Sequence, residues 1–160
     1  MKKTLEVSAL FLSSLSLAAF ANGTGVHAHG AARDDHASAI GKPGNPAEVT
    51  RTMMVDMNDA MRFIPATIDV KRGETVKFIV RNSGRLKHEM VLGTMQELKA
   101  HAEVMRQHPE MEHADENQVS VDPGKTGEIV WQFTNAGTFD FACLQPGHFE
   151  AGMKGAVVVK

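Results

Sequence analysis

Residues 139–155 read FDFACLQPGHFEAGMKG, and this stretch holds the only cysteine of the chain. Four residues separate Cys143 from His148, and four more separate His148 from Met153. A thiolate, an imidazole and a thioether are soft to borderline metal donors. With a second imidazole they form the trigonal set, completed by a weak axial methionine, that holds redox-active copper. The stretch therefore predicts three ligands of a copper site, with a further histidine required from elsewhere in the chain.

The flanks of this stretch predict a loop held between two β-strands. The alternation in FDFAC places Cys143 on the inward face at a strand end. Pro146 and Gly147 turn the chain, and the β-branched run GAVVVK at residues 155–160 forms the second strand. Taken singly, such residues are more often a structural cysteine, a surface histidine and a core methionine. Their shared spacing favours a metal site.

The missing imidazole is predicted to be His88. The sequence HEMVLG at residues 88–93 follows a loop and places His88 at the start of a strand, on the same face as Met90 and Leu92. A lone histidine in such a place is more often an ordinary core or surface residue. The other histidines outside the triplet, however, lie in the N-terminal region or in a helical insertion. The predicted ligand set is thus completed by His88.

Short strands separated by turn residues account for most of residues 49–160. Apolar side chains alternate in residues 75–81 and again in residues 128–133, where Ile129, Trp131 and Phe133 share one face. About seven such strands within some 110 residues are typical of an all-β, Greek-key β-sandwich. We expect one helix to be inserted between two of its strands.

The inserted helix is predicted to begin after Thr94 and to end before Pro109. Thr94 and Glu97 form a capping-box pattern, and apolar residues follow at helical spacing. We expect this amphipathic helix to cross between the two sheets. Histidines and methionines collect on it and just beyond it: His101, Met105, His108, Met111 and His113. A solvated helix edge is the favoured interpretation of this group, and an auxiliary, weaker copper site is the alternative.

The N-terminus predicts an exported protein. Residues 1–21 combine Lys2 and Lys3, an apolar run and the small-residue pattern AFA, which is typical of a cleavable export signal. No later segment approaches the roughly 20 apolar residues that a membrane span needs. Residues 22–48 lack hydrophobic periodicity and are predicted to be a flexible tail. Its histidines, His27, His29 and His36, are either solvated or hold a loosely bound cupric ion.

Net charge and cysteine content narrow the range of functions that are compatible with the sequence. The chain has 17 Lys and Arg against 19 Asp and Glu. Removing residues 1–21 takes two lysines and one glutamate, which leaves 15 against 18 and a net charge of −3. This balance argues against nucleic-acid binding. A single cysteine cannot form an internal disulfide, and copper ligation explains a lone thiol in an exported protein better than a free or intermolecularly paired one.

Residues 49–160 resemble the cupredoxin family of small blue-copper proteins, which includes azurin, plastocyanin and auracyanin. The spacing from Cys143 to His148, with Pro146 and Gly147 between them, is similar to azurin, and the spacing from His148 to Met153 is similar to plastocyanin. The sequences HEM and PGHFEAGM, together with the His- and Met-bearing helix, resemble the periplasmic CopI-type cupredoxins linked to bacterial copper tolerance. The resemblance implies one type 1 copper on the four predicted ligands.

Two positions depart from the electron-transfer members of that family. Those proteins commonly have asparagine after the first histidine ligand, where it braces the cysteine loop, whereas this chain has Glu89. Leu144 follows the cysteine where azurin and plastocyanin have a hydroxyl residue. Groups around a metal tune its potential and ligand geometry, so a perturbed, greener site is an alternative to a blue one.

Two functions are compatible with this sequence. The first is a periplasmic protein that protects the cell from excess copper, by binding it or by redox handling that includes oxidation of Cu(I). The second is an electron shuttle that serves an unidentified periplasmic redox partner. A hydrolytic enzyme is disfavoured, because no third catalytic member or oxyanion signature accompanies the cysteine.

Overall fold

The computed structural model describes residues 39–109 and 115–160. The predicted export signal and the tail histidines His27, His29 and His36 lie outside the described residues. Met111 and His113 also lie outside them. The predicted ligands His88, Cys143, His148 and Met153 all fall within the described part of the chain.

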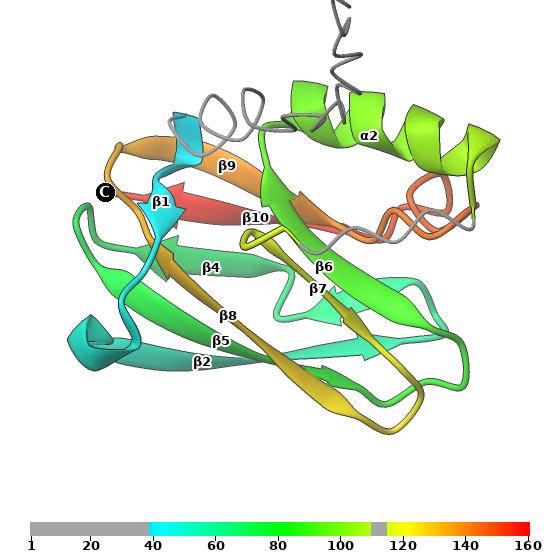
Figure 1. The fold of residues 1–160 in the computed structure, drawn as a ribbon, viewed down its shortest axis with the longest axis horizontal. Helices are drawn as coiled ribbons and strands as arrows, with labels where there is room; N and C mark the ends of the chain where they lie inside the picture. The colour runs from blue at the N-terminus through cyan, green and yellow to red at the C-terminus, as the bar shows by residue number, and fades with distance from the viewer. Residues whose placement is uncertain (1–38, 110–114) are drawn as a thin grey trace, which may run out of the picture.

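Two five-stranded sheets pack face to face, with strand orders β1-β8-β5-β2-β3 and β4-β10-β9-β6-β7 (Figure 1). The first sheet comprises β1 (Lys42–Pro43), β8 (Thr126–Gln132), β5 (Thr75–Asn82), β2 (Arg51–Asn58) and β3 (Arg62–Ile64). The second comprises β4 (Thr67–Val70), β10 (Lys154–Val159), β9 (Gly137–Ala142), β6 (His88–Gly93) and β7 (Gln118–Val121). The predicted β-sandwich with one inserted helix is confirmed. The strands that the sequence did not predict, β1 and β3, have two and three residues and are too short to show alternation.

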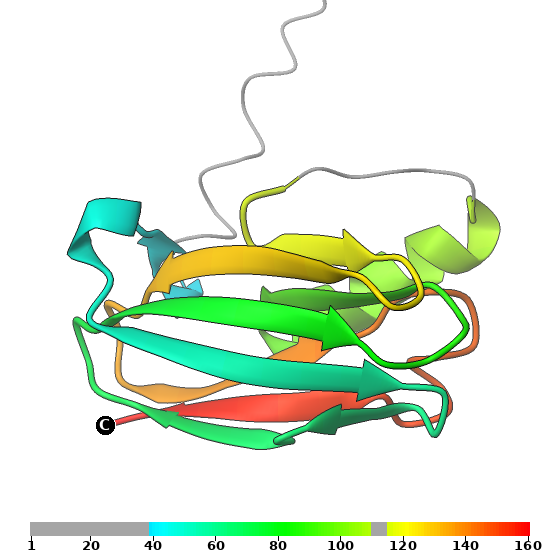
Figure 2. The same ribbon diagram turned by 90° about the horizontal axis from the view of Figure 1, so that it is seen from below.

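The main core lies between the sheets and follows the predicted alternation. Successive side chains of a strand point to opposite faces, so one row of each strand turns inward. In β5, which lies between β8 and β2 in Figure 2, Val76, Phe78 and Val80 have no exposed surface. An edge-to-face aromatic pair crosses the core between the sheets, with the ring centroids of Phe63 and Phe141 5.0 Å apart. This packing fixes the ends of β6 and β9, where the predicted ligands lie.

Helix α2 (Met95–Gln107) covers the outer face of the second sheet (Figure 1). It packs over β6 and β9, and its residues Leu98, Ala102 and Met105 form a second, smaller core with side chains of the sheet and with Leu144 of the loop after β9. All six residues of β6 are therefore buried, although the sequence predicted one buried face. The described residues contain no helix long and apolar enough to cross a membrane.

The start of α2 is as predicted, whereas its course is not. The Glu97 amide donates to Thr94 Oγ1 at 3.3 Å, and the Thr94 amide donates to a Glu97 carboxylate oxygen at 2.8 Å, which completes the capping box. The prediction that the helix crosses between the sheets is wrong. It connects β6 and β7, which are hydrogen-bonded neighbours in one sheet, and the apolar outer face of that sheet retains it.

Residues 39–48 fall within the predicted flexible tail, yet they pack against the sandwich. Strand β1 pairs with β8, and Ile40 is 1% exposed. The Trp131 indole N–H donates to the Ile40 carbonyl at 3.2 Å. Gly41 has a φ of 125°, and a side chain there would collide with the Gln132 carbonyl. One isoleucine anchors this segment, which explains why hydrophobic periodicity did not reveal it.

Candidate metal centre

The predicted ligands meet at one end of the sandwich because β6 and β9 run antiparallel. His88 is the first residue of β6, and Cys143 directly follows the last residue of β9. The pairing of Val91 with Ala142 places the start of one strand beside the end of the other. The loop from Cys143 to Met153 then supplies the remaining candidates before β10 begins.

Three donor atoms converge within ligand distance of one another. His88 Nδ1 lies 3.2 Å from His148 Nδ1, and Cys143 Sγ lies 3.3 Å from the same atom. All three lie within 4.8 Å of one another. With zinc as the reference, bonds of about 2.0–2.3 Å to nitrogen and sulfur place neighbouring ligand atoms roughly 3.3–3.7 Å apart. The arrangement therefore fits one transition-metal ion, and both imidazoles would bind through Nδ1.

Met153 is held beside these residues by the backbone of the loop. The Cys143 amide donates to the Met153 carbonyl at 3.1 Å, and the Met153 amide donates to the His148 carbonyl at 3.0 Å. The Met153 side chain has no exposed surface and belongs to the main core. The loop is thus closed by its own hydrogen bonds, and the thioether is shielded from water.

Asp59, in the turn between β2 and β3, orients His88 and was not predicted from the sequence. Its Oδ1 lies 3.1 Å from His88 Nε2, and its carboxylate also accepts the amides of Arg85 and Leu86. The Arg85 amide is the main group that holds the pKa of Asp59 below its ordinary value, so the carboxylate is ionised at neutral pH. Donation of the Nε2 proton to Asp59 leaves the Nδ1 lone pair of His88 facing the other donors. In the sequence, Asp59 looked like an ordinary turn residue.

Comparisons with known proteins identify the family to which the chain belongs. The model of a family described as copper binding proteins, plastocyanin/azurin family, matches residues 49–160. The chain belongs to this family. Three relatives are each named copper-resistant cuproprotein CopI. The one from Rubrivivax gelatinosus is 54% identical and spans 98% of this chain and 94% of its own. The one from Pseudomonas aeruginosa is 36% identical over 78% of this chain and 84% of its own. The one from Vibrio cholerae is 34% identical over 95% of this chain and 95% of its own.

Solved structures of this plastocyanin/azurin family share the fold. Sodium-dithionite-reduced auracyanin from Roseiflexus castenholzii superposes with a TM-score of 0.60 at 20% identity, over 70% of this chain and 98% of its own. An azurin (Az-iso2) from Methylomonas sp. strain J superposes with a TM-score of 0.55 at 17% identity, over 70% of this chain and 99% of its own. The resemblance that the sequence predicted is confirmed.

Glu89 departs from the family pattern but still braces the cysteine loop. Its carboxylate accepts the Leu144 amide at 2.9 Å and lies within hydrogen-bond distance of the Ser120 hydroxyl and the Gln145 side-chain amide. The Glu89 amide donates to Cys143 Sγ at 3.4 Å. Glu89 is only 6% exposed. The position that is commonly asparagine in the electron-transfer members therefore carries a buried carboxyl group here.

Burial sets the protonation states of Cys143 and His148. It raises the pKa of the Cys143 thiol to about 12, mainly through desolvation, and the nearby Glu89 charge adds to the rise. Burial also lowers the pKa of His148, and the neighbouring His88 lowers it further. At neutral pH the metal-free site thus holds a neutral thiol and a neutral His148. A metal that binds there must displace the thiol proton.

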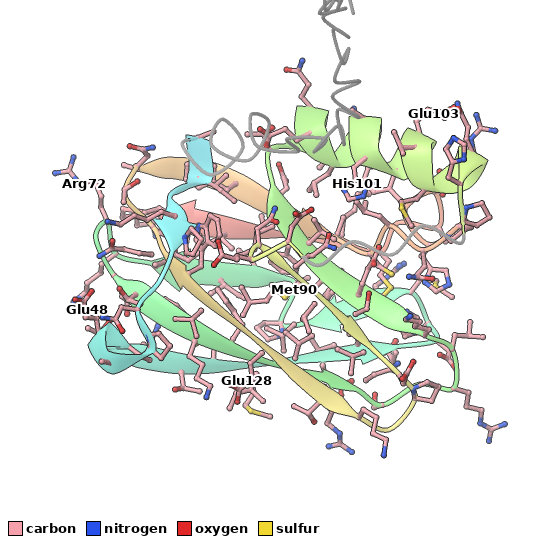
Figure 3. All side chains as sticks on the ribbon, in the orientation of Figure 1. Glu48, Arg72, Met90, His101, Glu103 and Glu128 are labelled. Carbon is pink, nitrogen blue, oxygen red and sulfur yellow. The ribbon has the colours of Figure 1, made fainter. Side chains whose placement is uncertain are left out.

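The predicted auxiliary donors that the structure describes, His101, Met105 and His108, differ in burial. Met105 is 5% exposed and packs in the second core, His108 is exposed at the end of α2, and His101 is half-buried (Figure 3). Within residues 39–109 and 115–160, His88, Cys143 and His148 are the only cluster of three or more His, Cys, Asp or Glu side chains with metal-ligand spacing. An auxiliary copper site that includes Met111 and His113 stays a prediction.

Removing the Asp59 carboxylate is expected to weaken copper binding about 10- to 100-fold, the usual effect of losing a partner of a ligating histidine. Asp59→Ala would free the His88 ring to rotate and release the loop before it. Copper affinity should be measured by competition with a chelator. The matched control is Asp69→Ala, which removes an exposed carboxylate that pairs with Lys160. Equal affinities for the two variants would contradict an orienting role for Asp59.

Proposed function

We propose that this protein is a periplasmic cupredoxin that binds one type 1 copper through His88, Cys143, His148 and Met153 and acts in copper tolerance. The convergence of two imidazole nitrogens and one thiol sulfur at 3.2–3.3 Å carries the proposal. Membership of a copper-binding family and the names of the three relatives support it. The predicted export signal supports a periplasmic location.

The residues around this centre have different roles. Bound copper would supply a one-electron couple, which suits either storage or redox handling of the metal. Cys143 gives up its proton, Asp59 fixes the ring of His88, and the hydrogen-bonded loop holds His148 and Met153 in place. Burial of the donors excludes water from the thiolate. These roles require little movement of the chain when copper binds.

Electron transfer is the second candidate function, and the partial exposure of His148 favours it. The other two donors, His88 and Cys143, have no exposed surface, whereas His148 is partly exposed beside the exposed Pro146 and Gly147. A ligand edge at the surface gives electrons a short path to a docked protein. Loss of copper tolerance on removing the protein from its host, restored by the wild type and not by Cys143→Ser, would support the tolerance role. Unchanged tolerance would favour the shuttle.

Copper binding is expected to strengthen as the pH rises. The metal-free thiol has a pKa of about 12, and the thiolate is the ligand, so one proton leaves for each copper bound. Below that pKa, the apparent affinity should rise about tenfold per pH unit for one displaced proton. Calorimetry in buffers of different ionisation enthalpy would count the protons. An affinity that stays constant from about pH 6 to about pH 8 would show that Cys143 does not bind as a thiolate.

Replacing Met153 with leucine should preserve copper binding and raise the reduction potential. In copper sites with two histidines, one cysteine and one methionine the thioether is a weak ligand, so the two imidazoles and the thiolate would still hold the metal without it. A spectroelectrochemical titration would measure the potential. Met105→Leu, the same change in the second core, is the control and should leave the potential unchanged. Complete loss of copper by a folded Met153→Leu protein would rule out the axial role.

A further inference from the structure

Glu89 places a carboxyl group in the interior, directly beside the candidate ligands. It follows His88 in the chain, and its own amide donates to Cys143 Sγ at 3.4 Å. Its side chain lies opposite Ser120 in the β6–β7 pairing and reaches the Leu144 amide. A carboxyl group at 6% exposure needs a reason, because burial of a charge is costly.

Among the described residues, the hydrogen-bond partners of this carboxylate are an amide N–H, a hydroxyl and a side-chain amide, all of them neutral. Hydrogen bonds of this kind stabilise an ionised carboxylate without cancelling its charge. A glutamine could accept the Leu144 amide equally well and would add no charge. The carboxylate therefore supplies something beyond the hydrogen bond.

That additional property is electrostatic. In a region shielded from water, a fixed negative charge stabilises the more positive of two metal oxidation states. We propose that Glu89 has two roles: it positions the cysteine loop through Leu144, and its charge favours Cu(II) over Cu(I) at the adjacent centre. This inference rests on the proposed copper site and extends it, since it assigns a direction to the redox preference of the protein.

Two substitutions separate the roles. Glu89→Gln keeps an oxygen for the Leu144 amide and removes the charge, whereas Glu89→Asp keeps the charge and withdraws the oxygen from that amide. For the copper-loaded protein, the reduction potential of Glu89→Gln should rise. At a fixed applied potential, the ratio of Cu(I) to Cu(II) should increase about tenfold relative to the wild type. Glu89→Asp should change the potential less. In the metal-free protein, the Leu144 amide should exchange about tenfold faster in Glu89→Asp and nearly as in the wild type in Glu89→Gln.

Glu48→Gln is the matched control, because Glu48 is an exposed carboxylate on the 3-10 helix η1 (Pro46–Glu48), at the opposite end of the sandwich from the ligand loop (Figure 3). It should leave both measurements unchanged. A wild-type potential in Glu89→Gln would overturn the electrostatic role, and wild-type exchange of Leu144 in Glu89→Asp would overturn the positioning role. If the wild type binds no copper, the proposed function fails instead, and the exchange measurement still tests the positioning role.

Discussion

Cys143→Ser is expected to abolish the intense thiolate-to-copper charge-transfer band of the copper-loaded protein. The band requires a sulfur ligand, and Cys143 is the only cysteine in the chain. His88→Ala should abolish it as well, because the site would lose one of its two imidazole donors. Visible and EPR spectra after addition of Cu(II) would measure both effects.

The control for this experiment is His108→Ala, which removes an exposed histidine at the end of α2 and should retain the full band. Circular dichroism would establish that each variant is folded. A full band in either Cys143→Ser or His88→Ala would refute the ligand assignment. A weak band in His88→Ala that recovers on addition of free imidazole would support it, because the added ring would fill the vacant position.

The second large effect concerns stability. Phe141→Ala should lower the free energy of unfolding by about 3–5 kcal/mol, the usual cost of truncating a buried aromatic side chain. Phe141 has no exposed surface and packs edge-to-face on Phe63, two residues before Cys143. Denaturant unfolding of the metal-free protein would measure the change without a contribution from copper.

Phe139→Ala is the matched control, because Phe139 lies on the same strand and is only partly buried. Its cost should be clearly smaller than that of Phe141→Ala. Equal losses in the two variants would show that the deeper burial of Phe141 does not make it the more important of the two side chains.

Much of the fold could be predicted from the sequence because it rests on local patterns. Alternation in β5 and β8 marked the inner faces, and the capping box marked the start of α2. The candidate ligands were likewise visible, since three of them share one short loop. Their spacing led us to expect that Cys143 and His148 would lie together, and the two donor atoms are 3.3 Å apart.

Other features depend on contacts between distant residues and left no local signal. Asp59 meets His88 only because the β2–β3 turn lies beside the start of β6. Ile40 is anchored by Trp131, which lies 91 positions later in the sequence. The course of α2 depends on the apolar outer face of β6 and β9, which alternation in a single strand did not indicate. The bracing role of Glu89 required the positions of Ser120 and Leu144.

Helix α2 covers only one of the two sheets, so the sheets differ in how well they are protected from partial unfolding. β6 and β9 are covered on both faces, by the main core and by the helix, whereas the outer face of β2 and β5 carries exposed residues such as Met54, which is 57% exposed. Partial unfolding generally begins where burial is least. We therefore expect a protease to cut first in the uncovered sheet. His88 and Cys143 lie at the ends of the protected strands, whereas Asp59, which orients His88, lies in the turn between β2 and β3 of the uncovered sheet. If the protein binds copper as proposed, opening of the uncovered sheet should therefore weaken the site before the strands that carry His88 and Cys143 unfold.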